Sequence, residues 1–148
     1  MWNELPSDRL RWWHNFRLEL DKLSLPEAIE QCCHLWSYSP FQKYYLLIDE
    51  YSQWPGPWEL IYDNVYCDLA KCLGIVYTLY LTKHKPHLEI RQYNDSEANI
   101  LYNLVFVERG KYVLNLEYDT ILNKKHIETS FKLQKRITIT DLKLDKIK

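Results

Sequence analysis

The chain has 148 residues with a formal net charge of -1, and 47% of its residues are hydrophobic, including six Trp and twelve Tyr. This composition supports one folded domain with its own core and excludes a disordered chain. Near-zero charge does not favour nucleic-acid binding, and we expect neither a signal peptide nor a membrane-spanning helix, because no apolar run is long enough for either.

Apolar residues recur at helical spacing from Ser7 to about Lys22, which predicts a first amphipathic helix with Ser7 as its N-cap. The stretch Ser24-Leu25-Pro26-Glu27 follows the S-x-x-E capping-box pattern and has Pro in the first turn. A second helix therefore begins here and continues to about Trp36.

Three further helical segments are expected before the hydrophobic spacing changes from helical to strand-like. A short helix is predicted over 41–51, and one or two turns over 58–63 follow the stiff turn "QWPGPW". The segment 67–81 is apolar on nearly every side, which is typical of a buried helix. We therefore predict that 67–81 is the central helix of the domain.

From residue 88 the hydrophobic pattern alternates as in strands, and Glu108-Arg109-Gly110 is typical of a hairpin turn. The predicted fold class is α+β, with N-terminal helices and a buried central helix packed on a C-terminal antiparallel sheet. A single domain spans 1–148, mainly helical over 1–81 and antiparallel over 88–142, with a tail at 143–148 that can fray. The predicted strands are 88–93, 100–107, 111–118, 127–133 and 136–142.

The four cysteines are expected to be reduced thiols, since no export signal accompanies them. Cys32 and Cys33 are adjacent, and Cys67 and Cys72 are five positions apart. Zinc sites favour tighter pairs such as C-x-x-C, so no metal and no other cofactor is expected.

Several motifs between Pro57 and about Tyr118 resemble the core of transglutaminase-like and papain-like cysteine enzymes. They are Cys67-Asp68-Leu69-Ala70, Leu73-Gly74-Ile75, Tyr102-Asn103-Leu104-Val105 and Gly110-Lys111-Tyr112. The resemblance implies that Cys67 is a nucleophile at the start of the central helix, where the helix dipole favours the thiolate. It also implies a His base on the neighbouring strand and an Asp or Asn that orients this base.

The chain departs from this pattern at the position of the base. The expected His falls on Ile100, and the expected acidic residue falls on Leu116, beside Asn115. A relocated base would have to come from His84, His87 or His126. Two interpretations of Cys67 therefore stay open: a structural thiol in a non-enzymatic protein, or the nucleophile of a cysteine hydrolase or acyltransferase.

The abundance of tryptophan predicts an aromatic contact surface for other protein subunits, since Trp and Tyr are favoured at interfaces. Trp12 and Trp13 are adjacent and cannot share one helix face, so one of them should be exposed. The candidate binding residues are Trp2, Trp12, Trp13, Trp54 and Trp58.

The segments 23–41 and 57–81 also resemble small proteins of tailed phages of the T4-like kind. This resemblance implies a structural or adaptor protein of the virion neck, tail or baseplate, located in the virion or in the host cytoplasm. The function predicted first is therefore non-enzymatic binding to the other protein subunits of a larger assembly.

Overall fold

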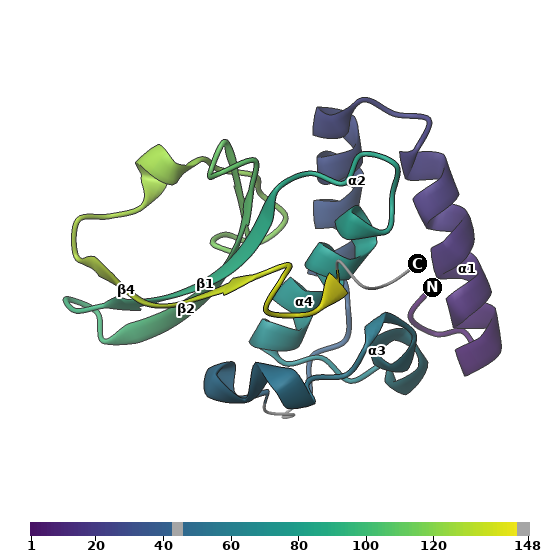
Figure 1. Ribbon diagram of the computed structural model, residues 1–148, viewed down its shortest axis with the longest axis horizontal. Helices are drawn as coiled ribbons and strands as arrows, with labels where there is room; N and C mark the ends of the chain where they lie inside the picture. The colour runs from purple at the N-terminus through teal and green to yellow at the C-terminus, as the bar shows by residue number, and fades with distance from the viewer. Residues whose placement is uncertain (43–45, 145–148) are drawn as a thin grey trace.

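The computed structural model describes residues 1–42 and 46–144, and it has the predicted α+β fold. Helices gather on one side of a twisted antiparallel sheet, and the sheet extends beyond them (Figure 1). In chain order the elements are α1 (Pro6–Leu20), α2 (Leu25–Ser37), the 3-10 helix η1 (Ile48–Gln53), α3 (Pro57–Asp63), α4 (Asp68–Tyr80), β1 (Leu88–Asp95), β2 (Ile100–Val107), β3 (Tyr112–Leu114), the 3-10 helix η2 (Lys124–His126) and β4 (Phe131–Thr138).

The described strands form one sheet in the order β3-β2-β1-β4, with every neighbouring pair antiparallel. Strands β1 and β2 pair from Leu88 opposite Val107 to Asp95 opposite Ile100. The predicted turn between β2 and β3 is confirmed, and Glu108, Arg109 and Gly110 all have positive φ. Gly110 has a φ of +90°, which favours glycine because side chains with a Cβ rarely adopt it.

The helix starts follow the sequence signals in α2 but not in α1. Ser24 accepts a hydrogen bond from the Glu27 amide and the Glu27 carboxylate accepts from the Ser24 amide, so the predicted capping box is confirmed. In α1 the N-cap is Leu5, and no side chain caps the helix. The prediction of Ser7 as N-cap is wrong, because Pro6 already occupies the first turn, where its fixed φ suits the helix.

Helix α4 is the central helix, as predicted. Residues 72 to 79 are all buried, and the helix contacts α2, α3 and the two middle strands. The main core of the protein forms around it, with Trp13 of α1, Trp36 of α2, and Ile90 and Val105 of the sheet.

The helix predicted over 41–51 is wrong at 41–42 and 46–47, which are not helical, and 48–51 belong to the 3-10 helix η1; residues 43–45 lie outside the described residues. Phe41 forms a parallel bridge with Tyr66, and the Gln42 amide donates to the Tyr66 carbonyl. This extended pairing uses a backbone conformation that a helix cannot have. Only η1, a six-residue 3-10 helix, follows.

Two strand predictions are also corrected. The strand predicted over 111–118 ends at Leu114, because Asn115 has a φ of +72° and turns the chain away. The two strands predicted over 127–133 and 136–142 are one strand, β4, with an irregularity in its pairing opposite Gln92 and Tyr93. Residues 139–143 form turns, in which the Leu142 amide donates to the Thr138 carbonyl, and residues 145–148 of the tail predicted to fray lie outside the described residues.

The sheet face away from the helices carries a second, smaller core. Tyr93, Leu104, Phe106 and Val113 are buried there, under the loop that carries η2 and leads to Phe131. Figure 1 shows this loop rising over the sheet between β3 and β4.

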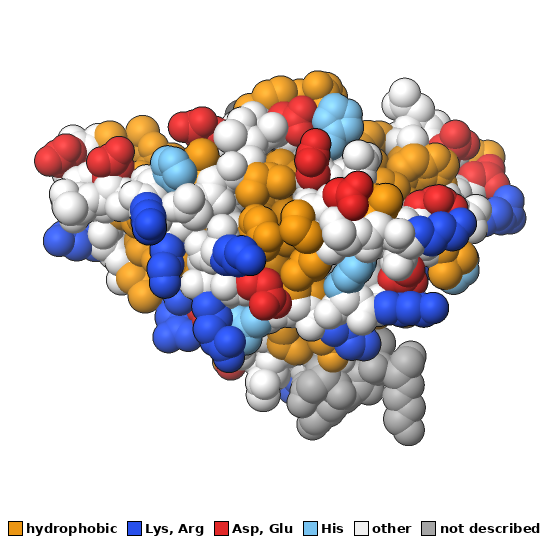
Figure 2. Space-filling view, turned by 90° about the horizontal axis from the view of Figure 1, so that it is seen from above, with side chains coloured by type: hydrophobic (Ala, Val, Ile, Leu, Met, Phe, Trp, Pro, Cys, Tyr) orange, Lys and Arg blue, Asp and Glu red, His pale blue; other side chains and the backbone are white. Residues whose placement is uncertain are grey.

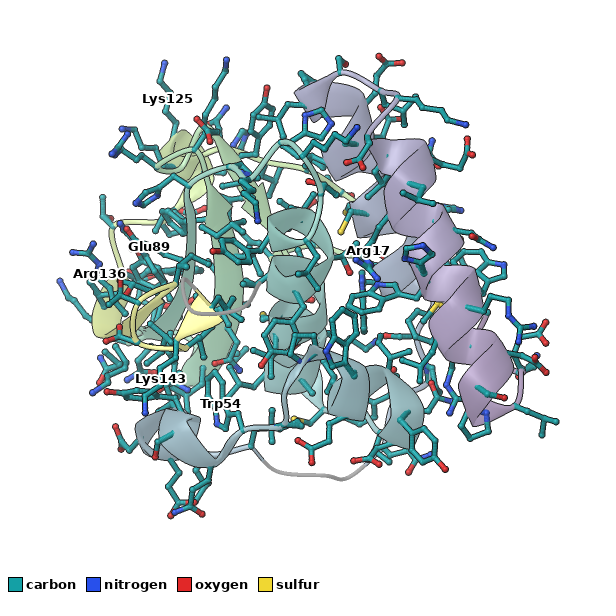
Figure 3. The ribbon with its side chains drawn as sticks, turned by 45° about the vertical axis from the view of Figure 1, so that its right-hand side comes forward. Arg17, Trp54, Glu89, Lys125, Arg136 and Lys143 are labelled. Atoms are coloured by element: carbon teal, nitrogen blue, oxygen red, sulfur yellow. The ribbon has the colours of Figure 1, made fainter. Side chains whose placement is uncertain are left out.

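A buried carboxylate stabilises the pairing of β1 with β4. Glu89 is 4% exposed, and its carboxylate accepts two hydrogen bonds from Arg136, both at 2.9 Å, and one from Arg91 at 3.1 Å. Burial alone would raise the pKa of Glu89, but the two arginines outweigh it and lower the pKa. Figure 3 shows Glu89 and Arg136 together on the sheet.

Because the pKa of Glu89 is lower in the folded chain than in the unfolded chain, its stabilising effect is present above the unfolded pKa, near 4. It is lost as the pH falls through the folded pKa. We expect Glu89→Gln to reduce the free energy of unfolding at pH 7 and to flatten its fall between pH 5 and pH 2. Arg136 is half exposed, so the loss at pH 7 should stay below the roughly 3 kcal/mol of fully buried pairs.

Urea unfolding of wild type and Glu89→Gln across this pH range measures the effect. Glu128→Gln is the control, since that side chain is exposed. Parallel pH profiles for wild type and Glu89→Gln would contradict the assignment.

Candidate functional site

Cys67 is the N-cap residue of α4, so it lies where the resemblance to cysteine enzymes places a nucleophile. It is half-buried, and its side chain makes no capping hydrogen bond. Asp68 occupies the first turn of the helix, where a carboxylate interacts favourably with the helix dipole. The local geometry therefore matches one of the three parts that a cysteine hydrolase needs.

The five imidazoles do not supply the second part. His34 Nδ1 lies 3.0 Å from an Asp119 oxygen, His84 Nε2 lies 3.0 Å from the Leu20 carbonyl, and His126 contacts Asn123. His14 and His87 are exposed. Within residues 1–42 and 46–144, no imidazole is hydrogen-bonded to Cys67. The chain thus holds its candidate nucleophile without a base in contact.

A hydrogen-bonded polar cluster stands beside the start of α4 instead. Asp68 accepts from the side-chain amides of Asn103 on β2 and Asn115 after β3, each at 3.0 Å. The two N–H groups of Asn115 are shared among three acceptors, because its Nδ2 also lies 2.9 Å from the Asn103 carbonyl oxygen and 3.3 Å from Cys72 Sγ. Gln92 on β1 donates to the Asn103 side chain at 3.1 Å. This polar cluster connects the helix N-terminus to three strand regions.

The sulfur in the polar cluster is that of Cys72, one turn inside the helix, and not that of Cys67. Cys72 is fully buried, and burial together with the nearby Asp68 charge raises the pKa of its thiol well above the usual value. A protonated thiol that donates to the Asn103 carbonyl at 3.2 Å is a structural group. The polar cluster can position α4 on the sheet, but its amides cannot accept a proton from a nucleophile.

Sequence reasoning did not identify Asn103 and Gln92 as members of this cluster. Two members of the cluster lie in or beside motifs that the sequence analysis used. Asn103 is inside Tyr102-Asn103-Leu104-Val105, and Asn115 is next to the expected acidic position. Gln92 had no signal, because its contact with Asn103 depends on the register of β1 and β2. The contact of Gln92 with Asn103 can therefore be found only once the pairing of β1 with β2 is known.

The cysteines are expected to differ in reactivity because of burial alone. All four are free; Cys32, Cys33 and Cys72 are buried, and burial raises the pKa of each of these three thiols. In the native protein, iodoacetamide should modify one thiol per chain, Cys67, and the other three only after unfolding. Mass spectrometry of labelled peptides gives the order.

The rate of that reaction tests catalytic activation. With no imidazole in contact, Cys67 in the native protein should react no faster than the same residue in urea. A native rate many times the unfolded rate would show an activated thiolate and favour the enzyme interpretation. Cys67→Ala, which should take up no label in the native state, is the control.

The predicted aromatic binding residues fall into two groups. Trp13 is fully buried, and Trp2 packs edge-on against Trp36 with ring centroids 5.0 Å apart, so both belong to the core. Trp54 is half-buried and donates to the Leu47 carbonyl at 3.0 Å; Figure 3 shows it near η1. Trp12 and Trp58 are exposed, by 37% and 49%. As predicted for the adjacent pair, one of Trp12 and Trp13 is exposed.

Two exposed aromatic residues lie on α3, which packs against α1. Trp58 and Tyr62 are one helical turn apart on α3, and Tyr62 is 55% exposed. The Trp58 ring packs edge-on against Trp13 with centroids 5.7 Å apart, and the Arg17 guanidinium lies 5.4 Å from its centroid. We call Arg17, Trp58 and Tyr62 the α1–α3 surface.

The face of the molecule drawn in Figure 2 has no strongly charged patch that would suggest a second binding site besides the α1–α3 surface. Figure 2 shows acidic, basic and hydrophobic side chains interleaved across it, without one large block of a single charge. In the described part of the chain, no cluster of three or more His, Cys, Asp or Glu side chains could hold a metal ion. Among the helices of residues 1–42 and 46–144, none has the length and apolar character needed to span a membrane.

Comparison with known proteins identifies no relative of this chain. No protein-family model matches the chain, and a search of curated proteins finds no match. The resemblances to cysteine enzymes and to phage proteins therefore rest on the motif residues alone.

Proposed function

We propose that this protein is a non-enzymatic adaptor that binds another protein through the α1–α3 surface. The observation that carries the proposal is the pair Trp58 and Tyr62, which lie on one face of α3 and are each about half exposed. Large aromatic side chains left in water by the folded chain gain roughly 1–3 kcal/mol each when a partner covers them. Trp, Tyr and Arg are also the residues enriched among interface hot spots.

The surroundings of Cys67 also support the proposal, because they weigh against the enzyme alternative. A helix N-terminus with a thiol but without a contacting base lacks the proton acceptor of a cysteine hydrolase or acyltransferase. The Asp68 carboxylate accepts hydrogen bonds from the side chains of Asn103 and Asn115, so these three groups are engaged in structure. The enzyme alternative retains one favourable feature, the half-buried sulfur at the start of α4.

The larger assembly that we propose is a phage virion, with the protein in the neck, tail or baseplate. Its support is the resemblance of segments 23–41 and 57–81 to small phage proteins. The protein would then be found in the virion, and in the host cytoplasm before assembly. The proposal of a protein partner does not depend on this setting.

The test uses the partner that co-purifies with the full chain, reconstituted from two purified proteins. We expect Trp58→Ala and Tyr62→Ala each to weaken binding at least about tenfold in titration calorimetry, corresponding to about 1.4 kcal/mol. Phe41→Ala is the matched control, because its ring is also exposed but lies outside the surface. It should change the affinity less than about twofold.

Cys67→Ala separates the two functional interpretations. The adaptor proposal expects unchanged partner affinity and unchanged assembly for this variant. Loss of function with the fold preserved would overturn the proposal and favour a cysteine enzyme.

A further inference from the structure

Helix α1 places two arginines against the core, and the two differ in their hydrogen bonds. Arg9, 5% exposed, donates to the Ile61 carbonyl at 2.8 Å, to the Tyr62 carbonyl at 2.7 Å and to the Glu4 carbonyl. It satisfies carbonyl groups at the end of α3, which have no partner within that helix. Arg9 is therefore a structural residue whose donors are occupied.

Arg17 lies two turns further along the same helix face and has no such partners. It is 9% exposed, and its Nε is inaccessible to solvent and has no hydrogen-bond partner. No described residue accepts a hydrogen bond from its terminal nitrogens either. Figure 3 shows Arg17 on the inner side of α1, facing the rest of the domain.

The two tryptophans beside Arg17 stabilise its charge but leave its donors open. The guanidinium carbon lies 4.3 Å from the centroid of Trp13 and 5.4 Å from that of Trp58. Such contacts act on the face of the guanidinium, whereas its five N–H groups point outward in its plane. Aromatic rings therefore do not replace a carboxylate, and a buried donor without an acceptor is destabilising.

The nearest acidic group does not fill this role. Asp21 follows Arg17 by one turn, and its Oδ1 accepts from the Lys83 amide at 2.7 Å, which holds the carboxylate at the end of α4. Burial lowers the pKa of Arg17, and the charge of Asp21 only partly opposes this shift. The cation is thus incompletely neutralised within its own domain.

We infer that Arg17 is the anchor for an Asp or Glu side chain of the protein that covers Trp58 and Tyr62. The inference rests on the proposed function and names the chemistry of the partner at that surface. Unlike Nε, the two terminal nitrogens are not enclosed, and a carboxylate can accept one hydrogen bond from each of them, which gives the contact a defined orientation. The apolar neighbours of that acidic residue would cover the exposed parts of Trp58 and Tyr62.

A protein carboxylate fits this position better than a phosphate group. Phosphate monoesters carry nearly two negative charges, and Asp21 is close enough to act on Arg17. Because Asp21 already acts on the single positive charge of Arg17, one further negative charge is sufficient to balance the guanidinium. The exposed rings of Trp58 and Tyr62 on α3 require apolar contacts, which a peptide supplies.

Two peptides that differ only in charge test the inference on the ¹⁵N-labelled full chain. The probes are N-acetyl-Leu-Asp-Leu-amide and its Asn counterpart, and the readouts are the Arg17 Nε–H and Trp58 indole resonances. We expect saturable shifts of both resonances by the Asp peptide, with at least tenfold tighter binding than by the Asn peptide. Arg17→Met should abolish the preference, whereas Arg11→Met, an exposed arginine paired with Asp8, should not.

If Arg17→Met fails to fold, Arg17→Lys retains the charge but not the bidentate edge, and it should reduce the preference to a few-fold. Equal binding of the two peptides, or no shift of the Arg17 resonance, would overturn the inference. Saturation of the same resonance by inorganic phosphate but not by the Asp peptide would overturn the choice of a carboxylate. If Trp58→Ala weakens the protein complex while Arg17→Met does not, the adaptor proposal stands and the anchor fails.

Discussion

Replacing Thr78 with Val should lower the free energy of unfolding by about 3 kcal/mol or more, although the two side chains have nearly the same shape. The Thr78 hydroxyl accepts from the indole nitrogens of Trp13 at 3.0 Å and Trp36 at 2.9 Å, and it donates to the Gly74 carbonyl at 2.7 Å. All hydrogen-bonding capacity of the hydroxyl is thus in use. Val would leave two buried indole N–H groups unsatisfied, at roughly 1–3 kcal/mol each.

Thr82→Val is the matched control for this prediction. Thr82 lies one turn further along the chain, is also buried, and makes a single hydrogen bond to the Leu79 carbonyl. Its replacement leaves no buried donor unpaired, so the loss should stay near or below about 1 kcal/mol. Urea unfolding followed by tryptophan fluorescence measures both variants. Equal losses would show that the shared hydroxyl is not the acceptor of the two tryptophans.

The second large effect is expected for Gly74→Ala, a change that improves the propensity of an isolated helix by about 1 kcal/mol. A Cβ at position 74 would lie 2.2–2.4 Å from three ring carbons of Trp36. The ring cannot move away easily, since it packs against Trp2 and Tyr66 and its nitrogen is bonded to Thr78. Overpacking typically costs about 1–3 kcal/mol and occasionally more, so we expect a net destabilisation of about 2 kcal/mol.

Gly56→Ser is the control for the glycine. A Cβ at position 56 meets nothing within 4 Å, and Ser is favourable at the N-cap position that Gly56 occupies. Its stability should be unchanged or slightly increased. If Gly74→Ala proves as stable as wild type in denaturant unfolding, then α4 and α2 are not in the close contact described above.

These two predictions concern one feature, the junction of α1, α2 and α4. Trp13 and Trp36 approach from different helices and converge on one hydroxyl of the central helix. Gly74 allows α2 to approach α4, because no side chain separates the helix from the Trp36 ring. The aromatic abundance of the sequence is therefore partly explained by internal packing, and only Trp12 and Trp58 of the predicted set remain on the surface.

The candidate site has a half-buried thiol, Cys67, at the N-cap of α4, and no described imidazole is hydrogen-bonded to it. The position that the resemblance assigns to the base is Ile100, and this residue is 45% exposed at the far end of β2. Ile100 belongs to neither of the two hydrophobic cores, whereas Cys67 packs against the main core. The start of α4 is instead connected to the sheet by Asp68, Asn103 and Asn115.

Local patterns determined much of the fold. The capping box at Ser24, the apolar segment of α4, the strand 100–107 and the turn at Gly110 each depend on residues within a few positions of one another. Because such interactions are local, the α+β class and the central helix could be predicted from the chain alone. The exposure of one member of the Trp12–Trp13 pair follows from helix geometry in the same way.

Tertiary contacts decided the rest. Phe41 is extended because its partner is Tyr66, 25 positions away, and β3 is short because Asn115 turns toward Asp68 and Asn103. The satisfied donors of Arg9 and the open donors of Arg17 look alike in the sequence, since both arginines lie on the buried face of α1. Only the position of α3 distinguishes them, because its terminal carbonyls reach one arginine and not the other. Periodicity indicates which face is buried, whereas the packing of distant segments determines which buried groups have partners.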